Sequence, residues 1–110
     1  MKAPFEELAA LDRLVHEPAR LAILTALSAC AHADFLYLQG LTGLSKGNLS
    51  SHLSKLEEAE LVKVEKTFKG KMPHTRVSLT PSGKKAVERH WAQLERLRSS
   101  ARSWKSQGTS

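Results

Sequence analysis

Apolar residues recur at the 3.6-residue period of an α-helix throughout the first half of the chain. Pro18 suits the first turn of a helix, and Asp34 and Ser45 suit the N-cap positions before two further helices. A glycine-containing turn at residues 42–44 joins the last two segments, which is typical of a helix-turn-helix. The predicted helices cover residues 5–15, 19–31, 35–41 and 46–59.

The period then changes to two, which favours β-strands. Residues 61–68 place Val64 and Phe68 on one side, and residues 74–79 alternate in the same way. Residues 69–73 contain a glycine and a proline and therefore suit a loop. The pattern predicts a β-hairpin with a basic tip.

A final helix is predicted from Thr80 and Pro81, which form an N-cap followed by proline, to about residue 98. Residues 99–110 are polar and rich in serine, so we expect a disordered tail after a single domain at residues 1–98. A three-helix core, a hairpin wing and flanking helices at both ends predict an α+β, mainly helical fold of the winged helix-turn-helix class.

Positive charge is concentrated in the second half of the chain. The net charge is +6, and it is −2 over residues 1–44, +5 over residues 45–85 and +3 over residues 86–110. Residues 66–85 hold six basic side chains and no acidic one. This distribution favours a polyanionic partner, with an ordinary solvated face as the alternative.

Composition narrows the remaining possibilities. The 110 residues allow one domain with a modest core. No apolar stretch resembles a membrane span or a signal peptide, so we expect no membrane partner and a cytoplasmic location. Cys30 is the only cysteine, which excludes an intrachain disulfide, and its place on the apolar face of the second predicted helix indicates a packed thiol.

Catalytic chemistry finds little support in the sequence. There is no glycine-rich phosphate loop and no cysteine–histidine pair at catalytic or zinc-binding spacing. The five histidines do not cluster, and no carboxylate pair stands out. We therefore predict no catalytic residue, no metal and no cofactor, and we do not expect an enzyme.

Four segments carry a resemblance to known proteins: residues 18–27, 46–57, 68–75 and 79–83. In this order they resemble the second helix, the recognition helix, the wing and the closing helix of small winged-helix regulators related to the MarR and ArsR families. The resemblance implies a prokaryotic transcription factor that binds operator DNA as a dimer. Glu60 departs from the pattern, because these families commonly have a glycine there that ends the recognition helix. The cysteine and histidine metal-ligand motif of metal-sensing ArsR relatives is absent.

The predicted recognition helix turns Leu49, Leu53 and Leu56 to the core and a small polar face outward. Such a face lets a helix lie in a major groove about 12 Å wide. Asn48 suits an adenine edge and Lys46 a guanine edge or a phosphate, while basic wing residues suit phosphates. For the histidine of this helix, a packing role is equally consistent with the sequence. The residues predicted to contact DNA are Ser45, Lys46, Gly47, Asn48, Ser50, Ser51, His52, Ser54, Lys55, Lys69, Lys71, His74 and Arg76.

The first and last predicted helices carry apolar stripes that a three-helix core does not obviously bury. Pairing these stripes across a two-fold axis would set two recognition helices about 34 Å apart, one turn of DNA. Packing of the two helices within one chain is the alternative. The predicted interface residues are Leu8, Leu11, Val87, Trp91, Leu94 and Leu97.

The function predicted from these features is sequence-specific binding of double-stranded DNA by a transcriptional regulator, most simply a homodimeric repressor. The alternative is a winged-helix module that contacts proteins and does not bind DNA. The sequence identifies no small-molecule effector.

Overall fold

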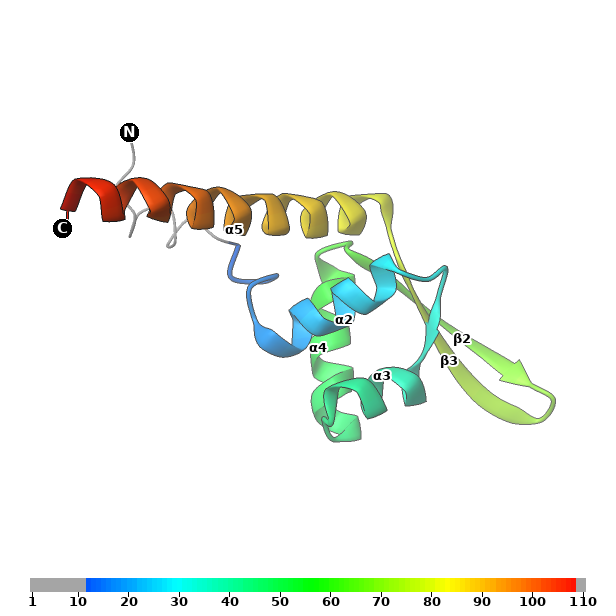
Figure 1. Ribbon diagram of the computed structural model, residues 1–110. Coiled ribbons are helices and arrows are strands. Elements are labelled where there is room, and N and C mark those ends of the chain that lie inside the picture. The colour runs from blue at the N-terminus through cyan, green and yellow to red at the C-terminus, as the bar shows by residue number, and fades with distance from the viewer. Residues whose placement is uncertain (1–11, 109–110) are drawn as a thin grey trace.

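The computed structural model describes residues 12–108, with the side chains of residues 12–103 (Figure 1). A bundle of three short helices lies beside a β-hairpin, and one long helix begins at the base of the hairpin and runs over the bundle, away from the hairpin. This arrangement confirms the α+β, mainly helical winged-helix fold. The elements are α2 (Pro18–Ser28), β1 (Ala33–Asp34), α3 (Phe35–Thr42), α4 (Lys46–Glu58), β2 (Val62–Lys69), β3 (Met72–Leu79) and α5 (Pro81–Gly108).

The first predicted helix, residues 5–15, lies mostly outside the described residues. Where the structure describes it, from residue 12 on, the chain turns and does not form a helix, so this part of the prediction is wrong. The Asp12 carboxylate accepts the Leu14 N–H at 2.9 Å. Such a local bond from an aspartate side chain competes with helix formation.

The core lies between α2, α3, α4 and the sheet, and each helix contributes one apolar face to it. Burial of each leucine or isoleucine side chain stabilises the fold by about 1.5–3 kcal/mol. The side chains with almost no exposed surface include Ile23, Leu24 and Leu27 of α2, Leu38 of α3, Leu49 and Leu56 of α4, and Val77 of β3.

Cys30 lies outside this core, and the prediction of a packed thiol is wrong. Helix α2 ends at Ser28, before the predicted end at residue 31, so Cys30 no longer follows the buried face of the helix. The thiol is exposed, and it donates a hydrogen bond to the Ala26 carbonyl at 3.4 Å.

The sheet has the strand order β1-β3-β2, and both neighbouring pairs are antiparallel. Strands β2 and β3 pair without interruption up to Lys69 opposite Met72, so the predicted loop at residues 69–73 is only a two-residue turn. Gly70, with φ of 67°, supplies the positive φ that a tight hairpin turn requires. We call the β2–β3 hairpin the wing and its residues 68–73 the wing tip.

Helix α5 begins as the sequence predicts, with Thr80 before Pro81. The Gly83 N–H donates to the Thr80 hydroxyl at 2.9 Å, which caps the first turn. The helix then continues to Gly108, so residues 99–108 do not form the predicted disordered tail. No proline or glycine interrupts the chain between Gly83 and Gly108, and a serine-rich composition alone did not end the helix.

The first turns of α5 pack on the core. Val87 is only 5% exposed and belongs to the apolar core, which overturns its prediction as a dimer-interface residue. One turn later, His90 is 1% exposed, and its Nε2 lies 3.3 Å from Nδ1 of His16. Burial lowers the pKa of His90, and the nearby His16 lowers it further.

Glu60 follows the C-cap residue of α4 and adopts the left-handed backbone conformation, with φ of 61°. The Glu60 N–H donates to the Glu57 carbonyl at 2.9 Å, and the Leu61 N–H donates to the Leu56 carbonyl at 3.0 Å. These two bonds form a Schellman motif, in which the left-handed position is usually a glycine. The helix end therefore has the geometry that a glycine usually adopts, although its residue is glutamate.

Gly83 should not tolerate even one additional carbon atom. A Cβ at this position would overlap the backbone carbonyl of Leu61 and the side chain of Leu79. We expect Gly83→Ala to lower the free energy of unfolding by about 2–3 kcal/mol, the cost of overpacking. Urea denaturation measures the change. Gly47→Ala, in open space on α4, is the control and should raise stability by up to about 1 kcal/mol. Equal stabilities of the two variants would contradict the close packing at Gly83.

Glu60→Gly should stabilise the protein. The left-handed conformation costs a residue with a Cβ roughly 1–2 kcal/mol, and glycine avoids most of this cost. We expect a net gain of about 1 kcal/mol in urea denaturation. Lys55→Gly, at an exposed position inside α4, should instead lose about 1 kcal/mol. A loss of stability in Glu60→Gly would show that the glutamate side chain contributes more than its backbone strain costs.

Candidate nucleic-acid interface

Helix α4 presents a continuous small polar face to solvent. Leu49, Leu53 and Leu56 are buried, as predicted, and hold the opposite face of the helix against the core. The Ser45 hydroxyl accepts the Asn48 N–H at 3.1 Å and caps the helix start. The exposed residues of this helix among the predicted contacts are Lys46, Gly47, Asn48, Ser50, Ser51, Ser54 and Lys55.

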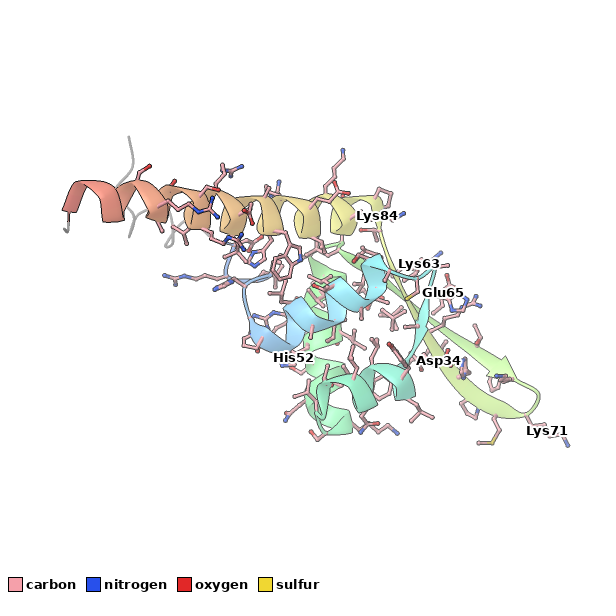
Figure 2. The ribbon with its side chains drawn as sticks, in the orientation of Figure 1. Asp34, His52, Lys63, Glu65, Lys71 and Lys84 are labelled. Atoms are coloured by element: carbon pink, nitrogen blue, oxygen red, sulfur yellow. The ribbon has the colours of Figure 1, made fainter. Side chains whose placement is uncertain are left out.

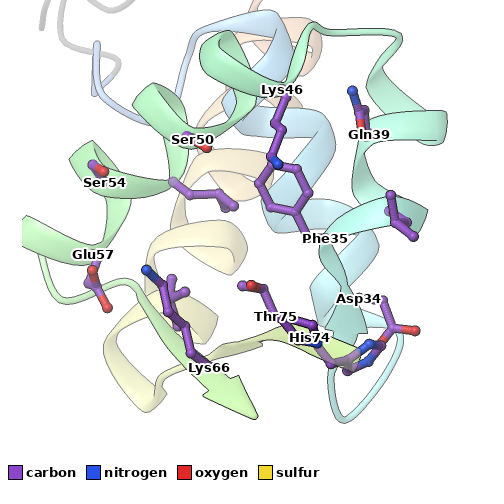
Figure 3. A pocket seen from close by; sticks show the side chains of 14 residues that line it. Asp34, Phe35, Gln39, Lys46, Ser50, Ser54, Glu57, Lys66, His74 and Thr75 are labelled. Atoms are coloured by element: carbon purple, nitrogen blue, oxygen red, sulfur yellow. The ribbon is translucent and has the colours of Figure 1, made fainter. Parts of the chain in front are cut away.

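A groove of about 650 Å³ runs between α4, the start of α3 and the wing (Figure 3). Lys46, Ser50 and Ser54 line it from α4, while Lys66 and Thr75 face them from the wing. Glu57 of α4 lines it as well, together with Asp34, Gln39 and His74, so the walls carry both signs of charge. Apolar side chains lie between these polar residues. They are Phe35, Leu36, Leu53, Val64 and Pro73.

Lys66 lines this groove but is not among the residues that the sequence predicts to contact DNA. The period-two alternation already places Lys66 on the same side as Val64 and Phe68, so the signal was present in the strand pattern. Phe35 and Gln39 line the groove from α3. Their participation depends on how α3 packs against the wing, which no local pattern reveals.

His74 holds the wing to the start of α3. Its Nε2 lies 2.8 Å from Oδ1 of Asp34, an ion pair when the histidine is protonated (Figure 3). Asp34 occupies the predicted N-cap position of α3, but its side chain makes no capping bond there. The contact gives both residues a positioning role, whereas the sequence predicts a contact with DNA for His74.

His52 docks α4 on the beginning of α2. Its side chain is only 21% exposed, and its Nδ1 lies 3.2 Å from Nη1 of Arg20 and 3.7 Å from Oε2 of Glu17. Arginine can only donate, so Nδ1 of His52 accepts in the Arg20 contact. The same glutamate oxygen accepts the Arg20 N–H at 2.8 Å and caps α2. Of the two roles left open for His52, these contacts support packing.

Arg76 belongs to an ion-pair cluster on the wing face away from the groove. Its Nη2 lies 3.6 Å from Oε2 of Glu65, and Lys63 Nζ lies 3.1 Å from Oε1 of the same carboxylate. Lys63 holds the pKa of Glu65 below its usual value, first by its hydrogen bond and then by its charge. Lys71, by contrast, is exposed at the far end of the wing (Figure 2), and Lys69 is exposed at the end of β2.

The predicted dimer residues lie in different surroundings. Leu8 and Leu11 are outside the described residues, and Val87 is part of the core. Trp91 is 46% exposed on α5, and Leu94 and Leu97 are half-buried one and two turns further on. The length of α5 beyond Val87 therefore keeps an apolar stripe that the described core does not fully cover.

The described residues were compared with the requirements of a metal site and of a membrane-spanning helix. Residues 12–103 contain no group of three or more histidine, cysteine, aspartate or glutamate side chains placed to hold a metal ion. None of the helices described is long and apolar enough to span a bilayer.

Residues 19–98 match the family model described as a winged helix DNA-binding domain. A transcriptional regulator homologue from Pyrococcus horikoshii is 31% identical with a TM-score of 0.80, and the match covers 87% of this chain and 97% of that one. A MarR-family regulator from Silicibacter pomeroyi is 25% identical with a TM-score of 0.63, over 97% and 66% of the two chains. An uncharacterized protein of Methanocaldococcus jannaschii is 30% identical over 86 residues, which are 77% of this chain and 92% of that protein.

Proposed function

This chain belongs to the winged helix DNA-binding domain family, and we propose that it is a homodimeric, sequence-specific transcriptional repressor that binds operator DNA. The single observation that carries the proposal is the small polar face of α4 beside a groove with lysines on both walls. A helix with small side chains can approach base edges closely, and the flanking lysines attract the phosphates on either side.

In the proposed complex, α4 lies in the major groove. Asn48 has the amide geometry that pairs with an adenine edge, and the serines can donate to or accept from any base. Lys46, at the first turn of α4, reaches a guanine edge or a phosphate. A strand of the duplex then passes along the groove between Lys46 and Lys66, which supply charge from opposite walls.

The wing supplies affinity more than sequence discrimination. Lys66, Lys69 and Lys71 lie along its outer half, and no acidic residue occurs between residues 66 and 85. Each phosphate neutralised by a lysine releases counterions, so binding should fall steeply with salt. His74, which contacts Asp34, is assigned to positioning the wing. Arg76 pairs with Glu65 on the far face of the wing and is assigned no contact with the duplex.

We assign dimerisation to the outer length of α5. This helix has 28 residues, a length of about 42 Å, and it extends well past the helical bundle (Figure 1). Trp91, Leu94 and Leu97 lie along its part beyond the core. A two-fold contact through this stripe would present two copies of α4 to one face of a near-palindromic site. We assign repression as the role because a protein bound at a promoter is enough to block polymerase.

The proposal predicts salt-dependent and sequence-dependent binding of duplex DNA. Fluorescence anisotropy with a labelled duplex from upstream of the gene, and with a scrambled duplex, measures both. We expect at least roughly 1,000-fold preference for the upstream duplex if it contains the operator. Lys46→Ala should weaken binding about tenfold and reduce the salt slope by about 1 per protomer. Arg76→Ala, which removes an equal charge from the far face of the wing, should change affinity less than about twofold.

Other outcomes of this titration separate the alternatives. Equal, salt-sensitive binding of both duplexes would place the operator elsewhere and leave DNA binding intact. Failure to bind either duplex at low salt would contradict the proposal and favour a winged-helix module for protein contacts. An equal loss in Lys46→Ala and Arg76→Ala would contradict the assignment of the groove as the contact surface.

The dimer is tested by placing a charge in the α5 stripe. Leu94→Glu should convert the dimer to a monomer in sedimentation velocity, because a charge buried in an apolar interface has no partner. DNA affinity should fall with it, since a monomer contacts one half-site. Ala92→Glu adds the same charge at an exposed position of α5 and should leave the dimer intact. A lower melting temperature of Leu94→Glu without a change of mass would show that Leu94 packs within one chain.

A further inference from the structure

The wing tip carries two large apolar side chains that the protein leaves in solvent. Phe68 is 74% exposed and Met72 is 70% exposed, with Lys69 and Lys71 beside them. Single exposed apolar residues are common on protein surfaces, but here two lie in one tight hairpin end. The tip therefore combines apolar surface with positive charge.

No other described element covers this end of the wing. Strand β1 pairs with β3 only at Arg76 and Val77, near the core. Beyond these residues the wing is a two-stranded ribbon that projects past the helices (Figure 1), with Lys71 at its far end (Figure 2). A narrow projecting ribbon is suited to entering a groove on a partner.

The two apolar side chains lie on opposite faces of the ribbon. Phe68 pairs with Pro73, and Met72 pairs with Lys69. Because paired residues share a face and successive residues alternate, Phe68 lies on the same face as Lys66 and Pro73. Lys66 and Pro73 line the groove beside α4. Phe68 thus extends the lining of that groove to the end of the wing, and Met72 faces away.

Charge indicates what occupies this surface. Lys66, Lys69 and Lys71 lie within three residues of Phe68, and no acidic residue occurs from position 66 to position 85. Glu57 and Asp34 line the groove beside α4, so the excess of positive charge lies at the wing tip, at Lys69 and Lys71. Duplex DNA and an anionic membrane are both complementary to such a tip. The continuity of the Phe68 face with the serine-lined side of α4 favours DNA, because a bilayer would leave α4 without a partner.

We propose that the wing tip is an apolar wedge, in which Phe68 enters the minor groove beside the major groove that holds α4. This inference rests on the proposed function. The lysines neutralise the phosphates on both sides, and the Phe68 ring replaces part of the base stacking at one step. The step opens and the duplex bends. Pyrimidine–purine steps such as TA and CA unstack most easily, so Phe68 selects sequence at a position where it makes no hydrogen bond.

The test uses the full chain and a duplex that the protein itself selects from a random library. End-to-end energy transfer reports the bend, and an aminopurine base at a TA or CA step reports unstacking. The wild type should bend the duplex by roughly 20–90° and raise the aminopurine fluorescence. Phe68→Ala should lose both signals and bind about tenfold more weakly. Phe68→Leu, which keeps an apolar wedge, should retain most of the bend.

Met72→Ala is the matched control, because it removes an equally exposed apolar side chain from the same tip on the opposite face. It should keep both the bend and the fluorescence change. Tight binding of a straight duplex, or an unchanged bend in Phe68→Ala, would overturn the wedge and leave the proposed function standing. Selection of no duplex at all would overturn both. Phe68-dependent binding to phosphatidylserine vesicles, without DNA bending, would identify the tip as a membrane contact and overturn the wedge.

Discussion

The backbone at Glu60 and Leu61 joins the three parts of the molecule that act together. The Leu61 N–H closes the end of α4, and the Leu61 carbonyl accepts the Thr80 N–H at 3.0 Å where β3 leads into α5. The Thr80 hydroxyl donates to the Glu60 carbonyl at 2.6 Å and accepts the Gly83 N–H. The end of α4, the base of the wing and the start of α5 are thus fixed to one another by backbone groups and by the Thr80 hydroxyl. This explains why a residue with a Cβ is held in a left-handed conformation at Glu60, and why no Cβ fits at Gly83.

The parts of the fold that the sequence predicts correctly are those set by local periodicity and local chemistry. The buried leucines of α4, its Ser45 cap and the start of α5 at Pro81 are examples, since each depends on neighbours within one or two turns. The errors arise where a competing interaction decides. The chain turns after Asp12, whose carboxylate accepts the Leu14 N–H, and an early end of α2 exposes Cys30. Strand β1 has two residues, which is too short to show any period.

In the candidate site, too, the features set by local periodicity can be predicted and those set by packing between elements cannot. The outward face of α4 can be predicted because it is the complement of the buried face. The second wall of the groove cannot, since it requires the packing of α3 and the wing against α4. His52 and His74 both hold elements together, and their partners Arg20 and Asp34 lie 32 and 40 residues away in the chain. Contacts over such separations leave no periodic signal in a single sequence.

The free energy that sequence-specific binding requires limits how much of it α4 can supply without the wing and α5. A good bidentate base contact discriminates by about 1–3 kcal/mol, whereas specific regulators exceed their non-specific binding by about 4–10 kcal/mol. On the exposed face of α4, Asn48 is the side chain best suited to such a contact, because Lys46 can also be engaged by a phosphate and serines discriminate weakly. One protomer would therefore fall short, and two would reach only about 2–6 kcal/mol. Where these contacts fall short of the difference, DNA shape is a second source of discrimination, and it is read through the relation of α4, wing and α5. The rigid junction at Glu60 and Leu61 is thus part of the proposed recognition mechanism as well as of the fold.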